Sequence, residues 1–199
     1  MPKNVEMDEC VFLPILTGTE ILQTGGVTTC ICLLIYGHLE NNTLFMGMYH
    51  WSGFDVEDSS SAVDEKTLVN SLVARLFYSA QQQLEQPANV RLYLDKLYIV
   101  GGERRQLAPN GELVLSGTEA DVSALKKYIT SQCKHFFVMK KANFYTANFL
   151  TKNDQDLTIT MNAAKPTWVI NNKPTAAAAA SEEDIDDGFD HSDPPSYKI

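Results

Sequence analysis

The sequence predicts an α+β fold: a strand-rich core of mixed or antiparallel sheets that carries two main amphipathic helices. Three observations lead to this class. Short apolar or β-branched segments, separated by turn residues, recur through residues 10–172. Two longer segments, 64–86 and 118–132, repeat apolar residues with helical spacing. The 199 residues, of which 44% are hydrophobic and 21% charged, have the composition of one globular domain with, at most, a small appendage.

The N-terminal quarter of the chain is predicted to form strands. Residues 11–16 form a short apolar segment, and the pair at 25–26 (Gly-Gly) predicts a turn. Residues 27–36, VTTCICLLIY, have no polar face, which is typical of a strand buried on both sides. After further turn residues, 43–49 predicts the strand that returns in a hairpin.

The two helices have recognisable ends. For 64–86, Asp64 or Thr67 is suited to cap the first turn, and Pro87 stops the helix. The segment 118–132 opens with a threonine followed by acidic residues in the first turn, where the helix dipole favours them. The remaining segments predict short strands, at 90–100, 113–115, 136–139, 143–150, 157–161 and 167–170, with a Pro-Asn-Gly turn at 109–111.

The chain divides near residue 175 into a folded domain, 1–175, and an acidic tail, 176–199. Five alanines, 176–180, precede seven acidic residues that lie between Ser181 and Asp193. Such a segment cannot bury enough apolar surface to offset the entropy of ordering it, so we expect disorder there. The tail holds most of the net charge of −9, and the domain is closer to neutral.

Composition also limits the function classes. No apolar run approaches the roughly 20 residues of a membrane-spanning helix, and the N-terminus lacks a classical secretory signal. Four scattered cysteines predict reduced thiols and a cytoplasmic protein. The negative charge argues against nucleic-acid binding. Cys30 and Cys32 could join His38 and His50 in a metal site, but no second pair has ligand spacing, so we expect no metal and no cofactor.

The hairpin supplies a candidate nucleophile. A five-residue loop from His38 to Asn42, centred on Glu40, would place Cys30 directly opposite His50. Directly paired residues have Cβ atoms about 4.5–5.5 Å apart, close enough for an imidazole to activate a thiol. The alternative is that Cys30 is a small buried hydrophobic residue and His50 an ordinary strand residue.

The surroundings of Cys30 favour a catalytic role. Residues 24–29, TGGVTT, are small, so a substrate can approach and backbone N–H groups can bind an oxyanion. Thr28 and Thr29 are therefore predicted to line the substrate site. Trp51, next to His50, is interpreted either as a wall of the substrate cleft or as a packing residue at its rim.

These residues resemble a known family. The pattern Thr-x-Gly-x-x-x-Cys at 24–30, followed by an apolar strand, a turn and Gly-Met-Tyr-His at 47–50, is similar to the CheD family of chemoreceptor deamidases and to related glutamine-deamidating toxins such as cytotoxic necrotising factor. A strand ending in Gly101-Gly102 also resembles that family. The resemblance covers roughly residues 10–150 and implies a CheD-like layered sandwich.

The resemblance implies an enzyme that hydrolyses a glutamine side-chain amide on a protein substrate. Cys30 would be the nucleophile, His50 its base, and Thr24 would hold the histidine or the substrate. Two other functions stay open. One is a binding module of the same fold without turnover, and the other is transglutaminase-like acyl transfer by the same cysteine.

The tail contains a short motif, Pro194-Pro195-Ser196-Tyr197. A PPxY sequence resembles the ligands of WW domains, in which proline packs into an aromatic groove. Because WW domains are chiefly eukaryotic, the motif favours a partner inside a eukaryotic cell. It would suit a bacterial effector delivered into a host cell without a classical signal peptide.

Overall fold

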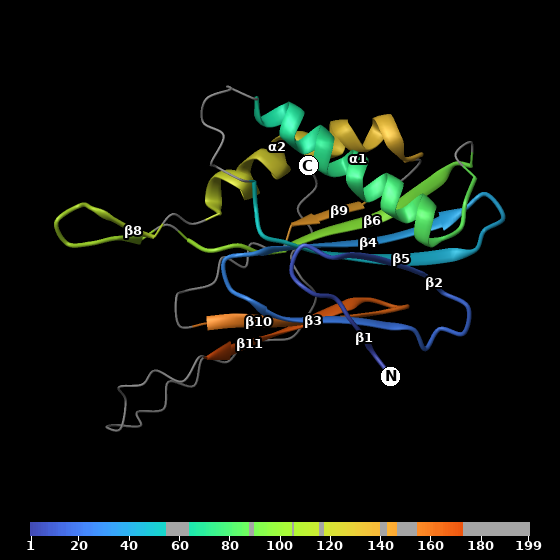
Figure 1. The fold of residues 1–199 in the computed structure, drawn as a ribbon, viewed down its shortest axis with the longest axis horizontal. Helices are drawn as coiled ribbons and strands as arrows, with labels where there is room; N and C mark the ends of the chain where they lie inside the picture. The colour runs from blue at the N-terminus through green and yellow to red at the C-terminus, as the bar shows by residue number, and fades with distance from the viewer. Residues whose placement is uncertain are drawn as a thin grey trace.

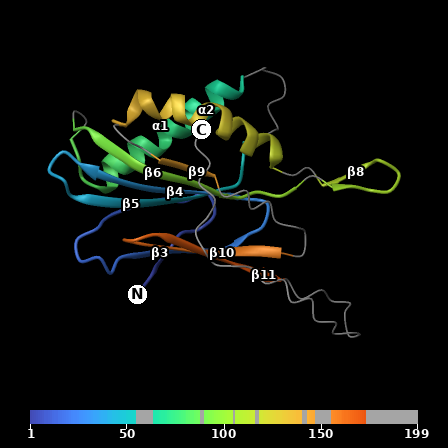
Figure 2. The same ribbon diagram turned by 180° about the vertical axis from the view of Figure 1, so that it is seen from behind.

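The computed structural model describes residues 1–54, 64–87, 90–104, 106–115, 118–139, 143–146 and 155–172. In the described residues the chain forms three layers, with two helices over a five-stranded sheet and a four-stranded sheet beneath it (Figure 1). The view from behind shows the same order of layers (Figure 2). The predicted α+β class, with a strand-rich core and two main helices, is confirmed.

The five-stranded sheet lies in the middle layer. Its strands, in spatial order, are β2 (Cys10–Pro14), β5 (Leu44–Trp51), β4 (Ile31–Leu39), β6 (Leu92–Gly101) and β9 (Asn143–Thr146). All pair antiparallel except β6 and β9, which are parallel. The expectation that the 27–36 segment is buried on both sides is confirmed for β4, because every β4 residue except His38 is buried.

The four-stranded sheet contains the N- and C-terminal strands of the described chain. Its spatial order is β1 (Lys3–Asn4), β3 (Ile21–Val27), β10 (Gln155–Asn162) and β11 (Pro166–Asn172). A separate small hairpin pairs β7 (Gln106–Leu107) with β8 (Leu113–Leu115) through the predicted Pro-Asn-Gly turn.

The glycine pair at 25–26 forms a β-bulge, so the predicted turn is wrong. Both glycines lie inside β3, where Val27 pairs with Leu157 and Thr24 pairs with Ile159. One extra residue on β3 is accommodated because Gly26 adopts a positive φ of 68°. The chain therefore continues in the sheet through both glycines before it leaves at Thr28.

Both helices pack on the outer face of the five-stranded sheet. Helix α1 (Glu65–Gln83) is capped as predicted, since the Asp64 side chain accepts a hydrogen bond from the Thr67 backbone N–H. Helix α2 (Glu119–Phe136) runs four residues further than predicted, and 136–139 forms only an isolated bridge between Val138 and Tyr93. The helix continues because Cys133 lies in the core and its carbonyl accepts the Phe137 N–H.

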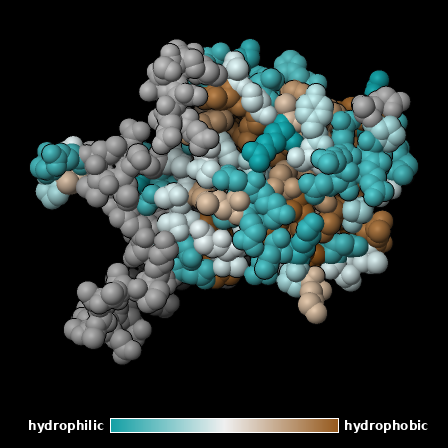
Figure 3. Space-filling view, viewed as in Figure 1, coloured by the Kyte–Doolittle hydropathy of each residue, from teal (hydrophilic) through white to brown (hydrophobic). Residues whose placement is uncertain are grey.

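Two apolar cores separate the layers. The core under the helices includes Ile31, Leu33 and Trp51 from the central sheet. The core between the sheets includes Cys30, Cys32 and Leu34, which alternate in the chain with Ile31 and Leu33, and it reaches Leu22 on β3. The face of the molecule in Figure 3 shows hydrophilic and hydrophobic side chains side by side. Among the described residues, no helix is long and apolar enough to cross a membrane.

Candidate functional site

The hairpin between β4 and β5 sets which residue faces His50. The turn is formed by Glu40, Asn41 and Asn42; the Asn42 N–H donates to the Leu39 carbonyl at 2.9 Å, and Asn42 adopts a φ of 63°. Asparagine tolerates this left-handed conformation, which closes a three-residue loop. The paired residue of His50 is therefore Cys32. The predicted five-residue loop, and with it the direct Cys30–His50 pairing, is wrong.

Cys30 nevertheless lies on the same side of the central sheet as His50. It precedes Cys32 by two residues and packs in the same core between the sheets. Cys30 and His50 are thus diagonal neighbours, a relationship in which side chains are about 7–8 Å apart in a regular ladder. Among the described residues, no hydrogen bond joins the Cys30 thiol to His50; the thiol is hydrogen-bonded to the Thr29 side chain instead.

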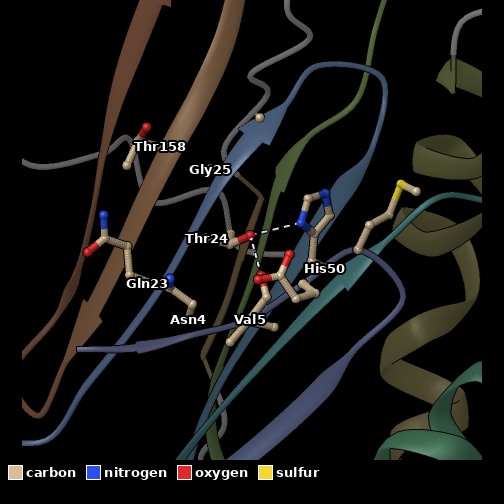
Figure 4. Close-up of a pocket in the computed structure, with 10 residues that line it drawn as sticks. Asn4, Val5, Gln23, Thr24, Gly25, His50 and Thr158 are labelled. Carbon is tan, nitrogen blue, oxygen red and sulfur yellow. Dashed lines mark hydrogen bonds between the residues drawn. The ribbon is translucent and has the colours of Figure 1, made fainter. Parts of the chain in front are cut away.

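His50 and Thr24 come from different sheets and meet between them. The Thr24 hydroxyl oxygen lies 2.8 Å from Nδ1 of His50 and 2.7 Å from the carbonyl oxygen of Val5 (Figure 4). Both side chains are buried. Leu22 and Thr24 are two residues apart on β3, so both side chains point toward the central sheet. Thr24 therefore reaches His50 at the last position before the β-bulge.

These two hydrogen bonds determine the protonation of the imidazole. The Thr24 hydroxyl has one proton, which it shares in a hydrogen bond with the Val5 carbonyl, so its oxygen accepts a hydrogen bond from Nδ1–H of His50. Nε2 then carries a lone pair. Nε2 is buried and has no hydrogen-bond partner within the described part of the chain. An unpaired basic nitrogen in a buried position is suited to accept a proton from a nucleophile or a hydrogen bond from a ligand.

The N-terminal segment holds this site together as it crosses from one sheet to the other. The Val5 N–H donates to Gln23 at 2.8 Å beside β3, and the Asp8 N–H donates to the His50 carbonyl at 2.6 Å. The His50 N–H in turn donates to the carbonyl of Glu9 at 3.2 Å. Sequence analysis missed this segment because its polar residues have no strand periodicity, and only the buried Val5 signals that it packs.

Hydrogen bonds from the end of β6 and the start of α2 fix the backbone around Cys30. The Gly102 N–H donates to the Cys30 carbonyl at 2.7 Å, and the Thr118 hydroxyl donates to the Thr29 carbonyl at 2.9 Å. Gly101, at a φ of 102°, must be a glycine, because a Cβ there would lie 2.6 Å from the Cys30 carbonyl oxygen. The end of β6 and the start of α2 therefore position the loop that carries the thiol.

Burial decides the charge state of the two reactive groups. It lowers the pKa of His50 below the ordinary histidine value, against the opposing negative charges of Asp8 and Glu6. It also raises the pKa of the Cys30 thiol, while the Thr29 hydrogen bond acts in the opposite direction. The resting pair is accordingly a neutral thiol and a neutral imidazole, with no thiolate–imidazolium ion pair.

A pocket of about 410 Å³ opens beside the histidine. Thr24 and His50 contribute to its lining together with residues of the N-terminal segment, β3 and β10, which are Asn4, Val5, Glu6, Met7, Gln23, Gly25, Gly26 and Thr158. Figure 4 shows Thr24 and His50 pointing toward one another from two elements of the pocket wall. Cys30 is outside this lining, so the pocket borders His50 but does not reach the thiol.

The other predicted lining residues divide between exposed and buried positions. Thr29 is exposed beside Cys30, and Thr28 is partly buried, with its hydroxyl 3.4 Å from the Gly26 carbonyl. Trp51 packs edge-on against Phe54 in the core under the helices, on the other side of the sheet from His50. The prediction of Trp51 as a cleft wall is therefore wrong, since neighbours along a strand face opposite ways. Pro194, Pro195 and Tyr197 lie outside the described residues.

The cysteines occupy separate environments. All four are free thiols, and within the described ranges no three His, Cys, Asp or Glu side chains are grouped to hold a metal ion. Burial raises the pKa of both Cys10 and Cys133 to about 12, and it raises that of the fully enclosed Cys32 further. The Cys30 thiol is hydrogen-bonded to the Thr29 side chain in a loop of small residues, and the Cys10 thiol is hydrogen-bonded to the Ser79 side chain.

Comparisons with known proteins assign no family to this chain. No family model matches it, and no curated protein matches it. The similarity to glutamine deamidases therefore stays a prediction, carried by Thr24, Cys30, His50 and the glycines Gly101 and Gly102 at the end of β6.

Proposed function

We propose that this protein is a cysteine-dependent protein-glutamine deamidase that uses Cys30, His50 and Thr24. The observation that carries the proposal is the Thr24–His50 hydrogen bond, which leaves a buried, unpaired Nε2 on the side of the sheet that carries Cys30. A base that is oriented by a third group and lies near a thiol is the arrangement that nucleophilic catalysis requires.

The reaction is hydrolysis of a side-chain carboxamide through a thioester. Nε2 of His50 accepts the thiol proton as Sγ of Cys30 attacks the carboxamide carbon, and the rotamer of Cys30 has to bring Sγ toward the imidazole. The C–N bond then breaks, and the proton on Nε2 passes to the nitrogen that leaves as ammonia. Water, deprotonated by His50, cleaves the thioester, which restores the thiol and releases glutamate. The reaction needs no cofactor.

Thr24 acts as a positioning residue in this scheme. Its oxygen holds Nδ1–H, which keeps the basic lone pair on Nε2, and it stabilises the imidazolium that forms during proton transfer. In this proposal the loop of small residues that precedes Cys30 would supply backbone N–H groups to the oxyanion. The product gains one negative charge, which would change how the substrate protein's surface binds its partners.

A binding module without turnover is the second candidate. It is favoured by two observations: burial raises the pKa of the Cys30 thiol, and Cys30 does not line the pocket beside His50. In such a module the pocket, and the PPSY motif at 194–197, would recruit partners. Under either function we propose a cytoplasmic site of action, since free thiols persist in reducing compartments.

Incubation with a eukaryotic cell lysate tests the deamidase proposal. We expect ammonia release and peptides whose mass identifies conversion of Gln to Glu, and both should disappear in Cys30→Ser and persist in the matched variant Cys10→Ser. Exchange of the amide for an added primary amine would show transglutaminase-like transfer instead. Partner complexes that survive Cys30→Ser, without any conversion, would show a binding module.

The tail is tested separately, with a chain that ends at Thr175. Under the proposal this truncation keeps Cys30 reactivity and the melting temperature, because the tail contributes no apolar face, and it lowers capture by a WW-domain protein. A tail that binds weakly by itself would act by raising the effective concentration of the domain near its substrate.

A further inference from the structure

His50, which borders the pocket, has a buried atom without a hydrogen-bond donor. His50 is 4% exposed and contributes to the pocket lining, and its Nε2 has no partner in the part of the chain that the structure describes. Because Thr24 fixes the proton on Nδ1, Nε2 is an acceptor. A buried acceptor without a donor costs free energy, which a ligand N–H would recover.

The charged side chain in the pocket lining is acidic. Glu6 is the one ionisable carboxyl in its lining, and no lysine or arginine lines it among the described residues. The negative charges of Glu6 and Asp8 both act on His50. The nearby guanidinium of Arg75 donates to the backbone carbonyl of Asp8 at 3.1 Å, and the ion pairs found among the described residues include none between Arg75 and Glu6. A ligand in this pocket therefore meets net negative potential.

The floor of the pocket suits a peptide. Gly25 and Gly26 are both exposed at the bulge, and a Cβ on Gly26 would meet nothing within 4 Å. A bulge leaves backbone groups of its strand unpaired, and those groups can pair with the backbone of an incoming chain. The remaining lining from Asn4, Gln23 and Thr158 is polar, which fits hydrogen bonding better than apolar burial.

We propose that this pocket selects substrate segments in which a lysine or arginine lies next to the target glutamine, with the cation held near Glu6 in the pocket and the glutamine extending past His50 toward Cys30. The inference rests on the proposed deamidase function, because it assigns the pocket to the residue that flanks the glutamine attacked by Cys30. It adds a sequence preference that the catalytic residues alone do not imply.

Three peptides test the preference. They are identical except for the residues that flank one glutamine, which are lysine, serine or glutamate. With the full chain at about 0.05 M ionic strength, we expect kcat/KM for ammonia release to fall from lysine to serine to glutamate, by roughly three- to fivefold at each step, and the differences to shrink at about 0.5 M. Glu6→Lys should invert the order. The matched variant Glu40→Gln, which removes an exposed acid in the β4–β5 turn, should keep it.

Binding separates the failure of this inference from the failure of the deamidase proposal. Fluorescence polarisation of the same labelled peptides with Cys30→Ser measures the preference without turnover. Preferential binding of the lysine peptide without turnover by the unmodified chain would uphold the pocket and overturn the deamidase. Turnover that is equal for all three peptides would uphold the deamidase and overturn the charge preference. Neither binding nor turnover would overturn both.

Discussion

Nδ1 of His50 lies 2.8 Å from the hydroxyl oxygen of Thr24, and this contact joins the central sheet to the smaller sheet beneath it. The same hydroxyl donates to the carbonyl of Val5, in the N-terminal segment that crosses between the sheets. One threonine thus connects three parts of the chain and fixes one tautomer of the histidine. The site therefore depends on how the two sheets pack as well as on the residues of either one.

Replacement of Thr24 by valine should lower both stability and activity. The variant leaves Nδ1–H and the Val5 carbonyl buried without partners, so we expect a loss of about 1–3 kcal/mol in the free energy of unfolding by urea denaturation. The histidine also loses its orienting acceptor, and ammonia release should fall by about 100-fold. Thr24→Ser should retain most of both properties. Thr167→Val, at an exposed position on β11, is the control; an equal loss there would contradict the role of Thr24.

Alkylation should label Cys30 faster than the other thiols. Burial raises the pKa of Cys10 and Cys133 to about 12, and it also raises the pKa of Cys30, but Cys30 lies in a loop beside the exposed Thr29. Since the thiolate reacts and the pKa of Cys30 lies above the ordinary cysteine value, its rate should rise about tenfold per pH unit from neutral pH to pH 9. Peptide mapping after iodoacetamide treatment measures the rates. A plateau below pH 7 would reveal a thiolate–imidazolium pair and contradict the neutral resting state.

The sequence predicted what local patterns control. The helical spacing and Asp64 cap of α1, the doubly buried β4 and the α+β class all depend on neighbours along the chain, and the structure confirms them. The hairpin register depended instead on one left-handed residue, Asn42, which moved the partner of His50 from Cys30 to Cys32. The resemblance predicted that Thr24 holds either His50 or the substrate, but no periodicity could reveal the Thr24–His50 contact, because it forms only when the two sheets pack.

One error could have been avoided from the sequence. Trp51 follows His50 within one strand, and alternate residues of a strand face opposite sides. A histidine facing the smaller sheet therefore requires a tryptophan facing the helices, where the structure places it. The position of the N-terminal segment 5–9 could not be predicted from strand alternation, because the segment is held by backbone hydrogen bonds to β3 and β5.

Protonation of His50 should destabilise the fold. Burial lowers its pKa in the folded state below the value of the unfolded chain, so the unfolded state binds more protons between the two values. The contribution to stability is complete above the unfolded pKa of about 6.5 and is lost as the pH falls through the folded value. Melting temperatures between pH 7.5 and 5 should therefore fall less steeply in His50→Gln than in the unmodified chain. His38→Gln, which removes the half-exposed partner of Asp95, should keep the steep fall; a fall that is unchanged in His50→Gln would contradict the assignment.

Replacement of Gly101 by alanine should displace the loop that carries Cys30. The backbone there has a φ of 102°, and the added Cβ would lie 2.6 Å from the Cys30 carbonyl oxygen and 2.9 Å from a Val27 methyl group. We expect a loss of about 2 kcal/mol or more in the free energy of unfolding, from backbone strain and overpacking together.

Gly111→Ala separates the strain from the contact. Gly111 also has a positive φ, 81°, but a Cβ there meets nothing within 4 Å, so the variant should lose only about 1 kcal/mol. Urea denaturation compares the two proteins, and the rate of Cys30 alkylation reports the position of the thiol. The rate should change in Gly101→Ala and stay the same in Gly111→Ala, because only the former contacts the Cys30 backbone. Equal stability losses with unchanged Cys30 rates would show that β6 does not position the nucleophile.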